Sequence, residues 1–126
     1  MKFKTELGRR GEEEAVVFLK QKGYKVVARN VRTKFGEIDV VARERGTICF
    51  VEVRTRRGED KHEEALGSVD QRKQYQLSKL AIAFLQHNDL LGKKARFDVI
   101  SVCFAGSRAR ILLIKNAFPV ADKYNG

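Results

Sequence analysis

Residues 36–56 read GEIDVVARERGTICFVEVRTR, and this stretch decides the fold. It contains two segments rich in Val and Ile, residues 37–43 and 47–56, and such segments are typical of β-strands. Glu44, Arg45 and Gly46 lie between them and have the length and composition of a tight turn. The stretch therefore predicts an antiparallel hairpin whose side chains alternate between two faces.

Further elements are predicted on both sides of this hairpin. A helix is expected where apolar residues recur at helical spacing after the capping residue Thr5, and it ends before Gly23. The full set is a helix over 5–22, a strand over 24–31, the hairpin, a second helix over 69–87 and two strands over 96–105 and 109–115. The polar stretch 57–68 is interpreted as a mobile loop. This order predicts a single α/β domain over residues 1–126, with helices packed against a sheet.

Three acidic residues are expected to face the interior. Asp39 lies between Ile38 and Val40, Glu52 lies between two valines, and the hairpin brings the two carboxylates together. Glu12 falls inside the apolar arc of the first helix. Neighbouring buried carboxylates repel each other unless a cation joins them, and Mg²⁺ prefers such oxygen ligands. The pattern predicts a metal site at Asp39 and Glu52 with Glu12 in support.

The alternative is a set of ordinary ion pairs. In that interpretation Asp39 pairs with a nearby arginine, and Glu52 pairs with Arg29 or Arg54. Any one of these acidic residues alone would favour the ion pairs, whereas their combination in this order of elements favours a site.

Five motifs together resemble the YraN-like family of bacterial proteins: GRRGEEEA, GEIDVVA, FVEVRTR, VDQRKQ and RFDVISV. The resemblance covers nearly the whole chain, and that family is similar to Holliday-junction resolvases and to the PD-(D/E)XK nuclease superfamily. It implies a restriction-endonuclease-like αβββαβ core, with a mixed central sheet flanked by helices. It also implies that Asp39 and Glu52 bind Mg²⁺ or Mn²⁺ and that Glu12 matches an upstream helical acid.

One position departs from the superfamily pattern, because Arg54 stands where the motif has a lysine. Arginine stays charged and is a poor general base, although its planar group can hold a phosphate. Lys73, one turn before Leu77 on the second helix, is a candidate substitute, and the alternative is an ordinary surface lysine. Gln71 and Tyr75 resemble a QxxxY motif of some exonucleases in the superfamily, which we interpret as a coincidence.

The net charge of +10 is spread along the chain and predicts affinity for nucleic acid, with DNA favoured over RNA. The first 14 residues lack the apolar region of a signal peptide, and no run reaches the length of a membrane span. Cys49 and Cys103 lie far apart in apolar segments, which predicts two reduced thiols and a cytoplasmic protein. No membrane partner is expected. The residues expected to contact the nucleic-acid backbone are Arg9, Arg10, Arg32, Lys34, Arg56 and Arg57.

Two functions follow from these features. The first is a metal-dependent endonuclease that hydrolyses phosphodiester bonds, with branched DNA as a candidate substrate, Glu12, Asp39 and Glu52 at the metal, and Arg54 and Lys73 at the phosphate. A homodimer is expected by analogy, since junction-cutting nucleases need two sites. The second is a binding module with the same fold, silenced by Arg54. A scaffold that docks an acidic protein is a third interpretation.

Overall fold

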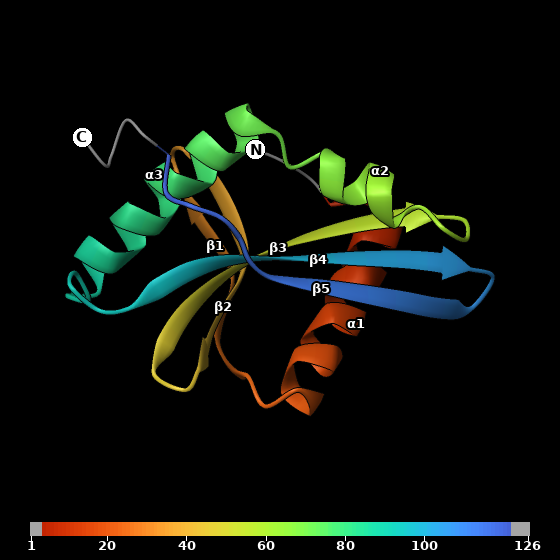
Figure 1. Cartoon of the computed structure of the whole chain (residues 1–126), viewed down its shortest axis with the longest axis horizontal. Coiled ribbons are helices and arrows are strands. Elements are labelled where there is room, and N and C mark those ends of the chain that lie inside the picture. Colours follow the sequence, from red (N-terminus) through yellow and green to blue (C-terminus); the bar gives the residue numbers. More distant parts are fainter. Residues whose placement is uncertain (1–3, 122–126) are drawn as a thin grey trace.

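The computed structural model describes residues 4–121, and its helices and strands follow the predicted order (Figure 1). They are α1 (Glu6–Gln21), β1 (Lys25–Thr33), β2 (Gly36–Glu44), β3 (Thr47–Arg57), α2 (His62–Gly67), α3 (Gln71–His87), β4 (Ala95–Ala105) and β5 (Arg108–Phe118). Most ends differ from the predicted ones by one to three residues, as helix and strand ends commonly do. The predicted α/β class with a restriction-endonuclease-like core is confirmed.

The five strands form one mixed sheet in the order β1-β2-β3-β4-β5. Strands β3 and β4 are parallel, and the other neighbours are antiparallel. Helix α1 covers one face of the sheet, and α2 and α3 lie on the other (Figure 1). The parallel pair requires a crossover, which the segment with α2 and α3 supplies.

The central hairpin forms as predicted. Arg45 and Gly46 both have positive φ, +50° and +79°, and this conformation matches the twist of the strands that a tight turn joins. The β2–β3 ladder then runs from Glu44–Thr47 to Val40–Val51. Side chains of β3 alternate as expected, with Val51 in the core under α1 and Phe50 in the core under α3.

Two hydrophobic cores hold the layers together, one on each face of the sheet. The core under α1 includes Ala15, Leu19, Val40, Val51 and Val102. The core under α3 includes Ile38, Val41, Phe50, Leu77 and Leu80. Ile38 and Val40 are two residues apart and would share a face in a regular strand, yet they lie in different cores. Strand β2 therefore rotates at Asp39, the residue between them.

The interpretation of residues 57–68 as a mobile loop was wrong, because α2 lies within this stretch. Its first residue, His62, has its Nδ1 atom 2.6 Å from the Ser101 hydroxyl on β4, and Ala65 is buried. A helix of six residues offers too few apolar positions to show a helical period, so the polar composition dominated the prediction.

Gly11 allows α1 to approach the sheet closely. A side-chain carbon at this position would overlap the hydroxyl and methyl groups of Thr55 on β3. The contact fixes the height of α1 above the sheet, and it therefore also fixes where the next residue, Glu12, can reach.

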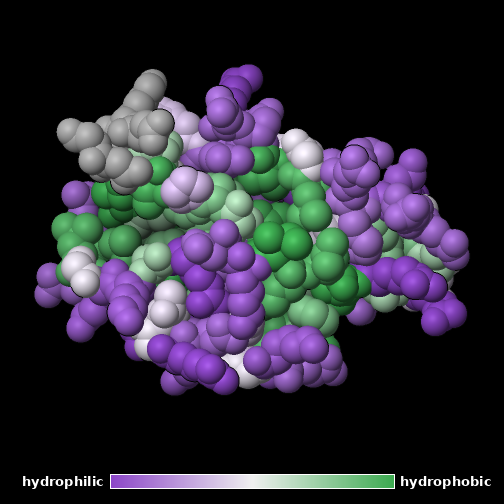
Figure 2. All heavy atoms as spheres, in the orientation of Figure 1, coloured by the Kyte–Doolittle hydropathy of each residue, from purple (hydrophilic) through white to green (hydrophobic). Residues whose placement is uncertain are grey.

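The face in Figure 2 carries hydrophobic side chains in two areas, left and right of the centre, with hydrophilic side chains between and below them and at the right end. Cys49 and Cys103 are both buried free thiols, as predicted. Within residues 4–121, every helix is too short or too polar to cross a membrane.

Candidate metal centre

Asp39 lies where β2 and β3 separate. The pairing of these strands ends at Val40–Val51. Beyond this pair the Asp39 side chain replaces the backbone as the acceptor, since its Oδ2 atom accepts a hydrogen bond from the backbone N–H of Val53 at 2.9 Å. On the neighbouring strand β1, Asn30 lies between the residues of two β1–β2 register pairs, Arg29–Val40 and Val31–Ile38, and it has a φ of +52°. This local irregularity accompanies the rotation of β2 and turns the Asp39 carboxylate into the opening between strands.

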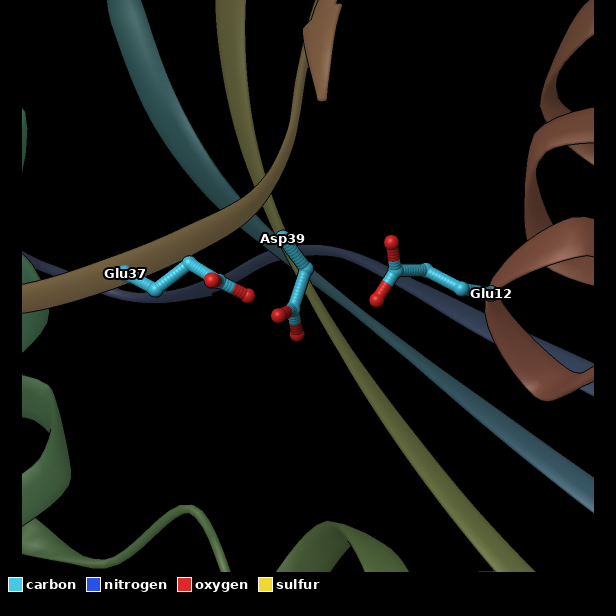
Figure 3. Close-up of side chains that lie close together, drawn as sticks. All are labelled: Glu12, Glu37 and Asp39. Carbon is cyan, nitrogen blue, oxygen red and sulfur yellow. The ribbon is translucent and has the colours of Figure 1, made fainter. Parts of the chain in front are cut away.

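Three carboxylates meet at this opening. Glu12 comes from α1, and Glu37 and Asp39 come from β2, so that one oxygen of each lies within 4.8 Å of the others (Figure 3). Glu12 and Asp39 had been predicted as site residues. Glu37 had not, although it lies two residues before Asp39 on the same strand, and this spacing is a signal in the sequence.

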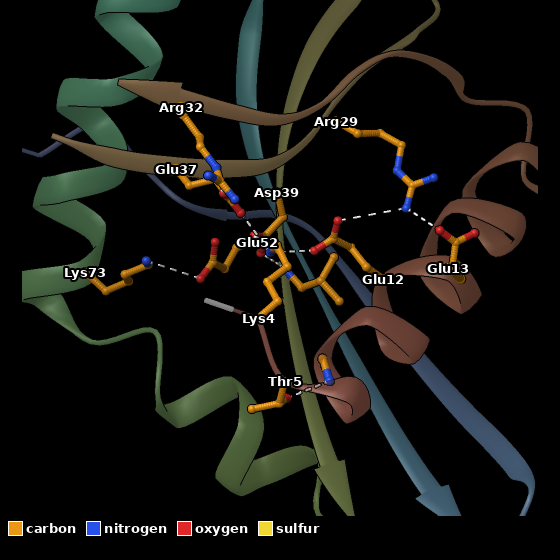
Figure 4. A network of polar contacts seen from close by, with 12 residues as sticks. Lys4, Thr5, Glu12, Glu13, Arg29, Arg32, Glu37, Asp39, Glu52 and Lys73 are labelled. Carbon is orange, nitrogen blue, oxygen red and sulfur yellow. Dashed lines mark hydrogen bonds and ion pairs between the residues drawn. The ribbon is translucent and has the colours of Figure 1, made fainter. Parts of the chain in front are cut away.

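The Lys4 ammonium lies among these carboxylates. Its Nζ atom is 2.6 Å from Glu12 Oε2, 2.8 Å from Glu37 Oε1 and 3.1 Å from Asp39 Oδ1 (Figure 4). Burial by itself lowers the pKa of this ammonium, but the three carboxylates outweigh burial and raise the pKa above its usual value. Lys4 therefore neutralises part of the cluster. Sequence reasoning missed it because it precedes the first helix and belongs to no periodic pattern.

Glu52 reaches the opening from the other side of the sheet. Its side chain is buried at 4% exposure, and burial followed by the negative charge of Asp39 raises its pKa to about 8. Its Oε2 atom contacts Arg54 and Lys73, whereas Oε1 has no hydrogen-bond partner among residues 4–121. A buried carboxylate oxygen without a partner is costly, which marks Glu52 as the least satisfied acid of the group.

Arg54 and Lys73 supply positive charge beside Glu52. The Arg54 Nη2 atom lies 3.2 Å from Glu52 Oε2, and Lys73 Nζ lies 3.6 Å from the same oxygen. The Arg54 Nε atom is buried and, within the described residues, has no partner. Arg29, a partner that the ion-pair interpretation offered to Glu52, pairs instead with Glu13 at 2.7 Å and lies 3.9 Å from Glu12.

The four acidic residues do not form one compact set. Glu12, Glu37 and Asp39 surround Lys4, and Glu52 meets Asp39 from the α3 side. A cavity of about 220 Å³ nevertheless joins the two parts, because Lys4, Glu12, Asp39, Glu52, Arg54 and Arg56 all line it. Asp39 belongs to both parts and is the centre of the site.

The six residues predicted to contact nucleic acid divide into two groups. Arg9 and Arg32 line a cavity of about 420 Å³ with Glu12, and Lys34 lines a cavity with Asp39. With Arg56 they surround the acidic residues. Arg10 instead lies over the Phe104 ring at 4.5 Å, and Arg57 is opposite Phe104 in the β3–β4 register, so both lie at that end of the sheet.

Tyr75 also lies near the site. It lines a cavity of about 520 Å³ that Arg54, Lys73 and Phe35 line as well. Tyr75 and Lys73, two residues apart on α3, thus line the same cavity.

Asp98 has a different role. It is fully buried and accepts hydrogen bonds from Tyr24, Arg96 and the backbone N–H of Asn116. Arg96 Nε lies 2.9 Å from Asp98 Oδ1, so Asp98 is paired with a neighbouring arginine.

Comparisons with known proteins agree with the resemblance found in the motifs. Residues 11–102 match the profile of a family described as "Uncharacterised protein family UPF0102". A UPF0102 protein of Geobacter metallireducens is 45% identical over 115 residues, which cover 91% of this chain and 93% of that protein. UPF0102 proteins of Syntrophus aciditrophicus and Myxococcus xanthus are 42% and 44% identical, over 90% and 91% of this chain and 89% and 90% of those proteins.

Proposed function

The chain belongs to the uncharacterised protein family UPF0102, and from its acidic centre and its restriction-endonuclease-like fold we propose that it is a metal-dependent nuclease acting on DNA. One observation carries the proposal. The Lys4 ammonium is held by three carboxylates next to a buried fourth, Glu52, whose Oε1 atom has no partner among residues 4–121. The centre is thus suited to positive charge, and part of its ligand set is available.

The donor atoms fit Mg²⁺ or Mn²⁺. Both ions prefer carboxylate oxygens, and Asp39 and Glu52 would hold the ion while Glu12 and Glu37 support it. Lys4 acts as a stand-in cation, since its ammonium already contacts Asp39 Oδ1. A bound ion would polarise a phosphodiester and make a coordinated water more acidic.

Arg54 and Lys73 would act on the phosphate. The buried Arg54 Nε atom offers a donor that has no partner within residues 4–121, and a scissile phosphate would supply the acceptor. Lys73 lies on the same side, 3.6 Å from Glu52, and would add a second positive charge. Neither group is assigned a proton transfer in this arrangement, so an arginine at position 54 is compatible with cleavage, although a lysine there could add such a transfer.

The surrounding cations would hold the DNA backbone. Arg9, Arg32, Lys34 and Arg56 line cavities that also contain the acidic residues, so they would contact phosphates beside the cut. Arg10 and Arg57 lie towards Phe104 and would contact a more distant part of the duplex. Such contacts position DNA without reading its sequence.

The direct test is cleavage of labelled DNA by purified protein. Junctions, flaps, tailed duplexes and RNA would be incubated with Mg²⁺ or Mn²⁺ and with chelator. We expect metal-dependent cleavage that Asp39→Asn and Glu52→Gln abolish, while Glu63→Gln, a change at an exposed residue of α2, leaves it intact. Cleavage that survives Asp39→Asn would come from a contaminant and would overturn the proposal.

A silent binding module with the same fold is the second candidate. Arg54 favours it, because it replaces the lysine of the superfamily motif. That function predicts salt-dependent DNA binding with no cleavage under any metal condition.

A further inference from the structure

The turn between β1 and β2 presents an aromatic ring to solvent beside the acidic centre. Among residues 4–121, five large apolar side chains are exposed, and Phe35 is the aromatic one, at 41% exposure. The other four are Val17, Val27, Leu91 and Leu112. An exposed apolar side chain is ordinary by itself, and Phe35 is distinguished by the residues that surround it.

The backbone that carries the ring is held by the turn. The Phe35 carbonyl accepts a hydrogen bond from Gln76 Nε2 at 2.8 Å, and its N–H donates to the Thr33 hydroxyl at 3.0 Å. Gly36 follows with a φ of +136°, and a side chain there would collide with Gln76. These contacts tie the turn to α3 and fix the point from which the ring projects.

Two lysines lie against the same ring. Lys79 Nζ is 4.6 Å from the ring centroid, and Lys34 Nζ is 5.2 Å from it. Both ammonium groups lie over the ring, so a base that stacks on it would displace at least one of them, and the displaced lysine would then be free to contact a phosphate.

The ring also lies between the two cavities that lead to the acidic centre. It lines one of about 420 Å³ together with Asp39 and Lys73. It lines the other, of about 520 Å³, together with Arg54, Lys73 and Tyr75. A nucleotide stacked on Phe35 would therefore lie within a short stretch of backbone from the proposed position of the scissile phosphate.

We propose that Phe35, flanked by Lys34 and Lys79, is a stacking platform for an unpaired base of DNA, so that the protein selects strands with unpaired nucleotides over uninterrupted duplex. The inference rests on the proposed function for its substrate, DNA. Within a duplex, both faces of each internal base are covered by neighbouring bases, and a terminal base stays paired with only one face exposed, whereas an unpaired base can turn out towards the ring.

The chain contains no tryptophan, so Phe35→Trp introduces a single fluorescent reporter at the platform. The variant would be titrated, in chelator, with a duplex carrying a single-stranded DNA tail, with the same tail made abasic, with the blunt duplex and with an RNA tail. We expect quenching and tight binding with the normal DNA tail but not with the abasic tail or the blunt duplex, and the RNA tail should quench as well because its bases have the same aromatic faces. Equal quenching by the abasic tail, or quenching by the RNA tail alone, would overturn the proposal.

Affinity measurements with truncated side chains complete the test. Phe35→Ala should weaken binding of the tailed duplex about tenfold, within the range measured for stacking contacts, and leave the blunt duplex within about twofold. Leu91→Ala removes a side chain that is even more exposed, at 59%, and should change neither affinity. Unchanged affinity of Phe35→Ala for the tailed duplex would refute the platform, provided that its thermal midpoint equals that of the wild type.

The two proposals can fail separately. If the wild type cleaves DNA and Phe35→Ala cleaves tailed and blunt substrates at unchanged rates, the platform fails and the nuclease stands. If no variant cleaves DNA but the fluorescence and affinity results are as expected, the platform stands and the nuclease fails.

Discussion

The Lys4 ammonium lies 2.6 Å from Glu12 Oε2, a shorter distance than any other in the acidic centre (Figure 4). This contact joins the start of the chain to the buried face of α1. It also gives the centre an internal cation, so that the carboxylates are partly neutralised without a metal.

Replacement of Lys4 by methionine should make the protein depend on metal. Without the ammonium, three carboxylates repel one another, so the thermal midpoint in chelator should fall, and Mn²⁺ should restore it. Affinity for Mn²⁺ should rise about tenfold, or about 1.4 kcal/mol, because no ammonium competes for the oxygens. Calorimetry measures both quantities. Lys61→Met, at an exposed surface pair, is the control, and equal Mn²⁺ affinity in the two variants would contradict the competition.

Glu52→Gln should change how stability depends on pH. Burial, and then the charge of Asp39, raises the pKa of Glu52 from 4.5 to about 8, so the folded state favours the protonated acid. The contribution of Glu52 to the free energy of unfolding is therefore fully present below pH 4.5 and is lost as the pH rises through about 8. The free energy of unfolding of Glu52→Gln, relative to the wild type, should therefore increase across this interval and level off above it.

Denaturant titrations at several pH values measure this difference, with Glu63→Gln as the control. A difference that stays constant with pH would mean that Glu52 has an ordinary pKa in the folded protein.

Arg54→Lys restores the lysine of the superfamily motif. A lysine in this half-buried position can lose its proton and assist a water, so cleavage should become at least about tenfold faster. Arg108→Lys, at the exposed start of β5, should leave the rate unchanged. Single-turnover rates decide the matter. If Arg54→Lys is instead as slow as Arg54→Ala, the arginine itself is required as a bidentate phosphate contact.

Arg9→Ala should reduce the salt dependence of DNA binding. If Arg9 contacts one phosphate, the slope of log Kd against log salt should fall by about one. Lys93→Ala is the control at a lysine remote from the acidic centre. Lys93 lies just before β4, whose first residue, Ala95, pairs with Ile48 near the hairpin turn. Fluorescence anisotropy across a salt series measures both slopes, and equal slopes would remove Arg9 from the interface.

Gly11→Ala should destabilise the fold by about 1–3 kcal/mol, because the new methyl group overlaps Thr55 and pushes α1 from the sheet. It should also weaken Mn²⁺ binding, since Glu12 moves with the helix. Gly67→Ala is the matched control, as a methyl group there meets open space. Chemical denaturation and calorimetry give the two quantities, and a Gly11→Ala variant as stable as the control would contradict the close contact.

Much of this arrangement could be predicted from local sequence patterns. Alternation in residues 47–56 predicted the two faces of β3, and the Arg45-Gly46 turn predicted the pairing that brings Asp39 near Glu52. The rotation of β2 at Asp39 could not be predicted, since it accompanies a left-handed conformation of Asn30, which asparagine tolerates but does not require. Lys4 and its contacts with Glu12 and Glu37 depend on tertiary packing, which no period in the sequence reveals.

The position of Lys4 has a practical consequence for metal titrations. Added Mn²⁺ must displace an ammonium that already contacts Asp39 Oδ1, so the observed affinity is that of an exchange. A polyhistidine tag supplies imidazoles that bind Mn²⁺ without this competition, and the titration would then report on the tag as well as on the protein. Preparations for such work should have the tag removed by a protease.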